Sequence, residues 1–197
     1  MSDELDAQLY VYPGTRVLRN LHDIRDPAKL EAFERQAVRR RIDQPIPVGR
    51  FDLQHLQAIH KHLFQDVYPW AGELRRVPLR KNDQQFMPPD RLEAGMADVH
   101  RRLTKDDLLR GLDDRQFSEQ AGVIIGDINH LHPFREGNGR TQLCYLRELG
   151  RVGGHQVEFS RIDKERWIEA SIASHMGDYG PMQSAIGQLT NDRERER

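Results

Sequence analysis

The side chains best suited to chemistry lie together in one polar stretch of the chain, which reads HLHPFREGNGR. Its two glycines, Gly137 and Gly139, let the backbone turn its N–H groups outward, because no Cβ blocks their approach to a ligand. If a helix begins there, the exposed amides, the positive end of that helix and the Arg140 guanidinium form an anion site. A candidate base, His132, and a candidate metal ligand, Glu136, lie beside it. This chemistry predicts an active site that handles phosphate groups.

The flanks of this polar stretch read as two buried helices. Residues 121–131 before it are mostly apolar, and residues 143–149 after it continue an apolar pattern. We therefore expect a loop held between two core helices, because functional loops are typically mounted on a rigid scaffold. Periodicity and capping residues predict further helices, at about residues 26–41, 51–63, 90–103, 114–131 and 163–177, with a last one ending near 189. The predicted fold class is all-α.

Residues 73–89 have a different character. Apolar residues alternate there with charged ones before Asn82-Asp83, a pair that favours a turn. This predicts a short hairpin, which Pro78 would confine to an edge. An exposed edge can bind an extended partner segment by strand addition.

Length and composition limit the class of protein. With 197 residues the chain can form one domain with a sizeable core, and 31% charged against 37% hydrophobic residues is typical of a soluble helical protein. A net charge of −1 gives no overall attraction to nucleic acid or to a membrane, so neither is expected as a partner. No secretory signal or membrane-length apolar run is found, which predicts a cytoplasmic location. The single Cys144 excludes an internal disulfide, and its apolar neighbours predict a buried, inert thiol.

The polar stretch resembles the signature of the Fic domain, H-x-F-x-[D/E]-G-N-G-R-x-x-R, and matches every fixed position but the last. Residues 12–15 (YPGT) and 64–72 (FQDVYPWAG) are similar to segments found upstream of Fic cores. The resemblance implies a Fic-type helical bundle with a small β-hairpin flap, spanning residues 10–189. A flexible N-terminus at 1–9 and a charged, disordered tail at 190–197 are expected on either side.

The same resemblance implies an activity. In Fic enzymes the histidine at the position of His132 takes the proton from a hydroxyl of a target protein, which attacks the α-phosphate of ATP. AMP is transferred and pyrophosphate leaves, so the chain is expected to be a protein adenylyltransferase. Glu136 would hold Mg²⁺, an ion that proteins bind with one or two carboxylates together with substrate phosphates. The residues expected to bind the ATP phosphates are Gly137, Asn138, Gly139 and Arg140. The related Doc kinases carry a bulky cationic side chain at position 139 and donate the γ-phosphate, so the glycine here favours nucleotidyl transfer.

The departure from the signature is Leu143, which replaces its last arginine. A side chain four residues after Gly139 lies on the same helix face and points back toward the helix N-terminus. An arginine there would reach the terminal phosphates, and its loss weakens ATP binding by roughly 1.5–3 kcal/mol. Arg147, one turn farther, could substitute for it. The alternative hypothesis is therefore a catalytically weakened or non-catalytic Fic domain that binds a nucleotide or an antitoxin.

Two protein partners are implied by the resemblance. Fic proteins hold their target with a hairpin flap, which corresponds here to about residues 75–86. Many Fic domains are held inactive by a helix with the pattern [S/T]-x-x-x-[E/D]-[G/N], and this chain contains no complete copy. We therefore expect a toxin whose inhibitory helix comes from a separate small antitoxin.

Histidines allow two other interpretations. A metal-dependent hydrolase could use His130, His132 and Glu136. A second metal site could involve His55, His60 and His62 on one predicted helix. His55 and His62 share a face of it, but metal pairs on a helix favour i, i+4 spacing and no carboxylate joins them.

Overall fold

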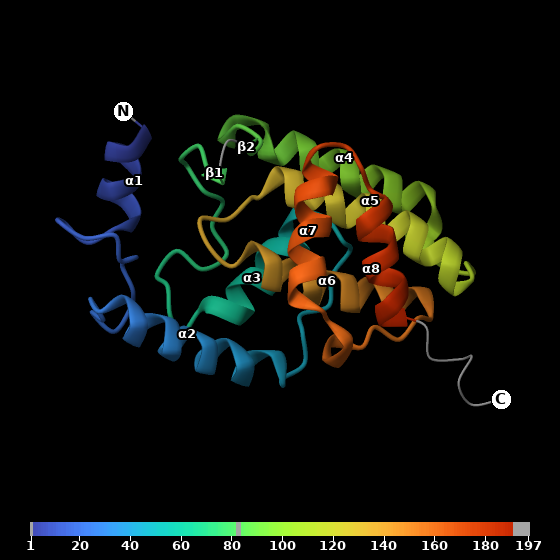
Figure 1. Ribbon diagram of the computed structural model, residues 1–197, viewed down its shortest axis with the longest axis horizontal. Helices are drawn as coiled ribbons and strands as arrows, with labels where there is room; N and C mark the ends of the chain where they lie inside the picture. Colours follow the sequence, from blue (N-terminus) through green and yellow to red (C-terminus); the bar gives the residue numbers. More distant parts are fainter. Residues whose placement is uncertain (1, 82–83, 191–197) are drawn as a thin grey trace.

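The computed structural model describes the backbone of residues 2–81 and 84–190, with side chains over residues 5–81 and 85–190. Its elements, in chain order, are α1 (Ser2–Tyr10), α2 (Pro27–Ile42), α3 (Leu53–Phe64), β1 (Arg80–Lys81), β2 (Gln84–Gln85), η1 (Pro89–Arg91), α4 (Leu92–Lys105), η2 (Asp107–Leu109), α5 (Asp114–Leu131), α6 (Asn138–Gly153), η3 (Phe159–Arg161), α7 (Lys164–His175) and α8 (Gly180–Thr190). Figure 1 shows a bundle of helices with the small hairpin at one edge. The predicted all-α class is confirmed.

Helix α5 is the centre of the bundle. It begins with a capping box, in which the Asp113 side chain accepts a hydrogen bond from the Gln116 N–H at 2.7 Å and the Gln116 side chain accepts one from the Asp113 N–H. Helices α4, α6, α7 and α8 all pack on α5. The close approach of α8 requires a glycine, because a Cβ at Gly122 would lie 2.8 Å from the Cα of Gln183. The C-terminal end of α5, where the polar stretch begins, is therefore firmly supported.

Helix α6 follows the polar stretch and packs on α3 and α5. Its Tyr145 is fully buried, and the hydroxyl donates to the Phe51 carbonyl at 2.8 Å. Cys144 in the same helix is a free and fully buried thiol, and burial raises its pKa to about 11. The prediction of a buried cysteine is confirmed.

The N-terminal region differs from the expectation of a flexible segment at residues 1–9. Ser2–Tyr10 form helix α1, and Asp6 accepts two hydrogen bonds from Arg135, at 2.5 and 2.8 Å. A polar, acidic segment gives no sign in the sequence of a partner 129 residues away. Helix α2 begins where it was predicted, since the Asp26 side chain accepts from the Lys29 N–H at 2.9 Å and caps it.

The hairpin is shorter than the 75–86 segment expected. Its strands have two residues each and are antiparallel, with Arg80 opposite Gln85. One more bond, from the Phe86 N–H to the Leu79 carbonyl at 3.1 Å, extends the pairing. Regular pairing cannot continue far toward the N-terminus because Pro78 has no N–H to donate.

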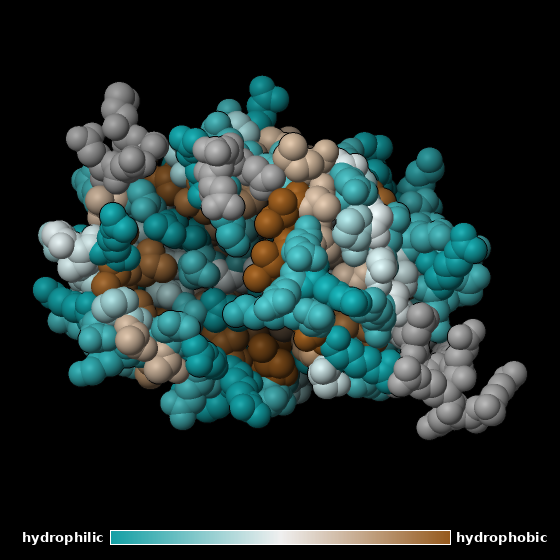
Figure 2. Space-filling view, in the orientation of Figure 1, coloured by the Kyte–Doolittle hydropathy of each residue, from teal (hydrophilic) through white to brown (hydrophobic). Residues whose placement is uncertain are grey.

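Two predictions fall on residues that the structure does not describe, the turn at 82–83 and the tail at 191–197. Thr190, which was assigned to the tail, is instead the buried last residue of α8. None of the helices within the described ranges is long and apolar enough to cross a membrane. Figure 2 shows a mostly hydrophilic face on which hydrophobic residues are visible mainly in the hollows between helices.

Candidate active site

The polar stretch is a tight loop between α5 and α6. Helix α5 ends at Leu131 because His132 adopts a left-handed backbone conformation (φ 47°, ψ 59°), while its N–H still donates to the Ile128 carbonyl at 3.0 Å. Helix α6 begins at Asn138 after Gly137, which is also left-handed (φ 82°). Residues other than glycine seldom adopt this conformation. The conformation of His132 must therefore be maintained by its surroundings.

Asn138 closes the loop from the inside. Its side-chain N–H donates to the Phe134 carbonyl at 2.8 Å, and its side-chain oxygen accepts from the Phe134 N–H at 2.9 Å. Both halves of the amide are thus used within the loop. The expected phosphate contact of Asn138 is therefore left to its backbone N–H, at the first turn of α6.

A histidine of α3 supports the loop from behind. The ring of His60 stacks on Phe134, with centroids 3.9 Å apart, and its Nε2 lies 3.0 Å from the Glu136 carbonyl. Its Nδ1 accepts from the Gly72 N–H at 2.8 Å, so Nε2 carries the proton and donates to Glu136. Burial lowers the pKa of His60 to about 4, which keeps it neutral. No pattern in the sequence links His60 to the loop.

His132 lies at the mouth of the loop with its ring against the hairpin. Phe86 stacks on it at 3.9 Å between centroids, with ring planes 16° apart. Its Nδ1 is buried and makes no hydrogen bond of ordinary geometry within the described part of the chain, while the backbone of Asn129 lies near enough to raise the pKa of the ring. Burial, more than the nearby Arg75 and Lys81, lowers the pKa of His132 to about 4. The imidazole is therefore neutral near pH 7 and free to accept a proton.

Glu136 and the glycines form the floor of the site. The Glu136 Oε1 accepts from the Gly137 N–H at 2.9 Å and lies 3.6 Å from Arg140 Nη2, and the side chain is 46% exposed, so part of the carboxylate is accessible from solvent. A Cβ at Gly139 would meet nothing within 4 Å, so the cradle is open at this position. Gly137 differs, because a Cβ there would lie 2.3 Å from the Phe64 ring.

Arg140 is paired with two carboxylates, and its Nη2 lies 3.6 Å from Oε1 of Glu136. Its Nη1 lies 2.7 Å from Glu34 Oε1 in α2, and its guanidinium lies 4.7 Å from the centroid of the Phe64 ring. Glu34 is buried and also accepts a hydrogen bond from the Tyr68 hydroxyl. The expected phosphate ligand is thus engaged by a carboxylate that sequence reasoning missed. A usable signal existed, since Glu34 lies one turn after Leu30 on the apolar face of α2, where an acid requires a partner.

The loop between α5 and α6 lines a cavity of about 350 Å³. This volume is within the range of roughly 300–1,000 Å³ that is usual for small-molecule sites. His132, Glu136 and the amides of residues 137–139 line one side. Helix α7 contributes the apolar Trp167, Ile168 and Ile172 together with Ser171 and His175. The hairpin contributes Lys81 and Phe86, and Lys81 is the only lysine or arginine among the described residues that line this cavity.

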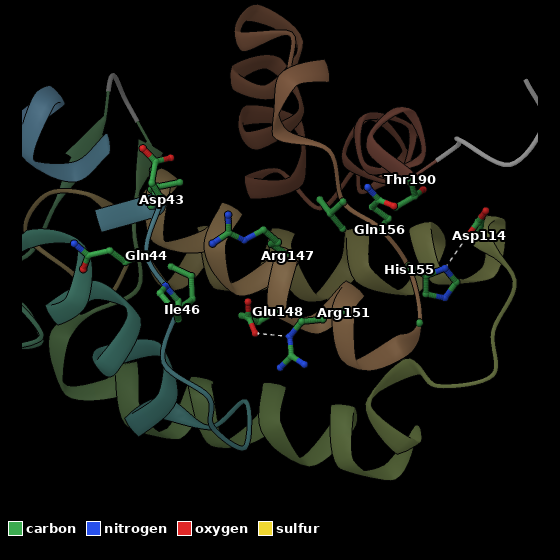
Figure 3. A pocket seen from close by; sticks show the side chains of 14 residues that line it. Asp43, Gln44, Ile46, Asp114, Arg147, Glu148, Arg151, His155, Gln156 and Thr190 are labelled. Atoms are coloured by element: carbon green, nitrogen blue, oxygen red, sulfur yellow. Dashed lines mark hydrogen bonds and ion pairs between the residues drawn. The ribbon is translucent and has the colours of Figure 1, made fainter. Parts of the chain in front are cut away.

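The two residues discussed for the last signature position lie elsewhere. Leu143 is partly buried against the hydrophobic core and does not line the cavity. Arg147 lies over the Phe159 ring at 5.1 Å and lines a separate cavity of about 780 Å³. In Figure 3, this second cavity lies beside α6 and contains an ion pair between Glu148 and Arg151 and a hydrogen bond between His155 and Asp114. Arg147 therefore does not replace the missing arginine in the observed conformation.

The metal interpretations find no support in the geometry. His55 and His62 each place Nε2 2.8 Å from a backbone carbonyl, of Pro47 and Arg41 respectively. Among the residues that the structure describes, no group of three or more His, Cys, Asp or Glu side chains could hold a metal ion. His130 instead lies against His175, so it does not join a hydrolase-type metal cluster with His132.

One cavity of this helical domain is lined by the neutral His132, the partly exposed carboxylate of Glu136 and the N-terminus of α6. This combination suits the transfer of a phosphate-containing group. The model of the Fic/DOC family matches residues 50–149, and the chain belongs to this family. It is 37% identical over 179 residues to the probable protein adenylyltransferase y4lH of Sinorhizobium fredii, covering 90% of this chain and 93% of that protein.

Solved structures of relatives agree with the fold. BepC, a VirB-translocated effector protein of Bartonella tribocorum solved with bound AMPPNP, superposes with a TM-score of 0.85 at 29% identity, over 95% of this chain and 98% of that one. The N-terminal Fic domain of a putative cell filamentation protein from Bartonella quintana, solved with bound ADP, gives 0.85 at 30% identity, over 95% and 96% of the chains. Both relatives were solved with a nucleotide bound.

Proposed function

We propose that this chain is a protein adenylyltransferase, which moves AMP from ATP to a hydroxyl side chain of a target protein. The observation that carries the proposal is a neutral His132 beside the open glycine cradle of α6, in one cavity with Glu136. Adenylyltransferase relatives and nucleotide-bound family structures support it. The proposed domain spans residues 10–189 as expected from the sequence, extended by α1 at one end and by Thr190 of α8 at the other.

The reaction requires a base and a held phosphate chain. His132 takes the proton of the target hydroxyl, whose oxygen forms a bond to the α-phosphorus. The bond from that phosphorus to the oxygen bridging to the β-phosphate breaks, and pyrophosphate leaves. A pKa of about 4 makes His132 by itself a weak base. The negative charge of bound phosphates raises it, because a nearby opposite charge favours the imidazolium form.

Charge on the phosphates is offset by the first turn of α6 and by Mg²⁺. The N–H groups of Asn138 and Gly139 belong to this turn, at the positive end of the helix. The exposed carboxylate of Glu136 is the residue that would hold Mg²⁺ together with phosphate oxygens. When bound, the ion supplies Lewis-acid stabilisation of the charge on the phosphates.

Helix α7 and the hairpin line the rest of the cavity, and we propose that they bind the nucleobase and the target protein. The apolar residues of the α7 wall suit a nucleobase, since Ile168 and Ile172 are 40% and 41% exposed there. The hairpin segment at 75–86 is proposed to hold the target in extended form, which would present a hydroxyl to His132 across Phe86.

We propose that the chain acts as a toxin in the cytoplasm, where ATP is available, and that a separate small antitoxin supplies its inhibitory helix. Nothing in the net charge or the cavity favours direct binding of nucleic acid.

The test uses ATP labelled at the α- or the γ-phosphate, with Mg²⁺ and a bacterial lysate. Wild type should transfer the α-label to protein and leave the γ-label in pyrophosphate, and mass spectrometry should find added AMP on a hydroxyl residue. His132→Ala should abolish transfer, while His100→Ala, on α4 and away from the cavity, should not. Equal labelling by wild type and His132→Ala would refute the proposed role of the histidine.

One observation favours the weaker alternative, a domain that binds nucleotide with little or no catalysis. Arg140 is paired with Glu34 and Leu143 carries no charge, so the cavity has one cationic side chain, Lys81, among its described lining residues. Measurable ATP binding with no transfer of α-label by wild type would establish this alternative.

A further inference from the structure

Arg75 is a cation buried in the protein with no carboxylate as a hydrogen-bond partner among the described residues. Its residue surface is 2% exposed, and its guanidinium donates only to backbone carbonyls. The acceptors are His132 (from Nε, 2.7 Å), Val77 (from Nη1, 2.8 Å), Leu131 (from Nη2, 3.1 Å) and Met87 (from Nη2). Burying a charge is costly unless it is paired and hydrogen-bonded. Here backbone carbonyls replace a carboxylate and take four of the five guanidinium N–H donors.

The four carbonyls come from two different parts of the molecule. Leu131 and His132 end helix α5, where carbonyls lack helical partners and the helix dipole is negative. Val77 and Met87 lie on the two legs of the hairpin, before β1 and after β2. One side chain therefore connects both legs of the hairpin to the residue that carries the candidate base.

Backbone hydrogen bonds follow the same path. The Arg75 N–H donates to the Pro133 carbonyl at 2.9 Å, and the Met87 N–H donates to the His130 carbonyl at 3.2 Å. Between these contacts, Phe86 stacks on the His132 ring at 3.9 Å. The left-handed backbone of His132 is thus braced on its carbonyl side by Arg75 and on its ring side by the hairpin.

Lysine could not make these contacts. An ammonium is a compact group on a flexible stem, whereas the guanidinium presents its donors in a rigid plane toward several acceptors at once. Burial lowers the pKa of Arg75 to about 10, so it remains a cation near neutral pH.

We propose that Arg75 is a positioning residue that couples the hairpin to His132, fixing where a target strand lies relative to the base. The proposal rests on the proposed adenylyl transfer for its kinetic consequence, whereas its structural consequence can be measured without any substrate.

The first experiment uses the unmodified chain and amide hydrogen exchange. If Arg75 joins the hairpin to the end of α5, the Met87 amide and the His132 amide are released in one opening event and exchange at rates within about threefold. Exchange of the Met87 amide more than about a hundredfold faster than that of His132 would overturn the proposal, because the hairpin would open alone.

The second experiment compares Arg75→Lys with Arg115→Lys, a control at the exposed beginning of α5 whose side chain is 86% exposed. Arg75→Lys should speed Met87 exchange and lower kcat for target modification by about tenfold or more, the effect of losing one charge-assisted bond. ATP affinity should change less than threefold, and the His132 ring, followed by NMR, should titrate closer to its ordinary pKa near 6.5. The control should change none of these.

The outcomes separate the two proposals. If Arg75→Lys leaves exchange and the His132 titration unchanged, or loses ATP binding and kcat in equal proportion, the positioning role is wrong. If wild type modifies no protein but exchange and titration respond as expected, the positioning role stands and the proposed transfer reaction fails.

Discussion

The substitution Glu34→Gln should destabilise the fold and strengthen ATP binding at once. Glu34 Oε1 lies 2.7 Å from Arg140 Nη1, the Tyr68 hydroxyl donates to the same carboxylate, and the Glu34 side chain is 11% exposed. Glutamine keeps the shape, but its neutral oxygen makes hydrogen bonds about half as strong. A bond to a charged group contributes about 1.5–3 kcal/mol and a neutral one about 0.5–1.5 kcal/mol, so two bonds lose about 2–3 kcal/mol.

The partial exposure of Arg140 to solvent reduces this loss of stability. The Arg140 side chain is 32% exposed, and solvent screening places the loss near 2 kcal/mol. For a domain of this size, that lowers Tm by roughly 4–8 °C. Without the Glu34 carboxylate, Arg140 keeps only the longer ion pair with Glu136 at 3.6 Å, so more of its charge acts at the beginning of α6. ATP affinity should then rise by up to about tenfold, or 1.4 kcal/mol, and AMP affinity should rise less.

The assay combines thermal unfolding with calorimetric titration of ATP and AMP. Glu31→Gln is the matched control, because Glu31 is also on α2 but its side chain is 70% exposed and pairs with Arg35 at the surface. Equal Tm values for the two variants would refute the estimate of stability. Weaker ATP binding in Glu34→Gln would refute the electrostatic reasoning, since it would mean that Glu34 holds Arg140 in the conformation that ATP needs.

Three further predictions concern the same loop. Burial lowers the pKa of His60 and of His132 to about 4, whereas in the unfolded chain both histidines have pKa values near 6.5. The free energy of unfolding should therefore fall as the pH drops from about 6.5 to about 4, by at most about 3 kcal/mol per histidine. Urea unfolding that is unchanged between about pH 7 and pH 5 would contradict this. Leu143→Arg should tighten ATP by up to about 3 kcal/mol and leave AMP nearly unchanged, and an equal gain for both nucleotides in a titration would show that position 143 does not face the terminal phosphates. Gly137→Ala should lower the melting temperature, because its φ is 82° and a Cβ would meet an aromatic ring at 2.3 Å, whereas Gly139→Ala, with open space, should change it little.

Local features of the fold were predictable because they depend on neighbours in the sequence. Asp26 caps α2, Asp113 caps α5 in a capping box, and the long apolar run of α5 becomes the central helix. The fixed spacing of the signature also placed His132 and Glu136 on one cavity. In each case the determining atoms lie within about one turn of one another.

The contacts that were missed join segments far apart in the chain. Arg140 is engaged by Glu34, more than a hundred positions earlier, and Arg75 donates to the His132 carbonyl across 57 positions. Which carbonyl or carboxylate a side chain reaches is set by how helices pack, and a charged residue in a sequence looks the same whether its partner is near or absent. The N-terminal helix α1, whose Asp6 binds Arg135, was missed for the same reason.

Because the Cys144 thiol is buried, its labelling by a thiol reagent can report on opening of the native structure. Cys144 is the only cysteine, and it lies in α6 less than two turns after the beginning of that helix. A thiol reagent added in solution can label it only in molecules whose α6 has opened. A nucleotide bound at the N-terminus of α6 would favour the closed helix and slow the labelling in proportion to its occupancy. Labelling time thus becomes a measure of ligand binding that needs no catalysis, no target protein and no engineered probe.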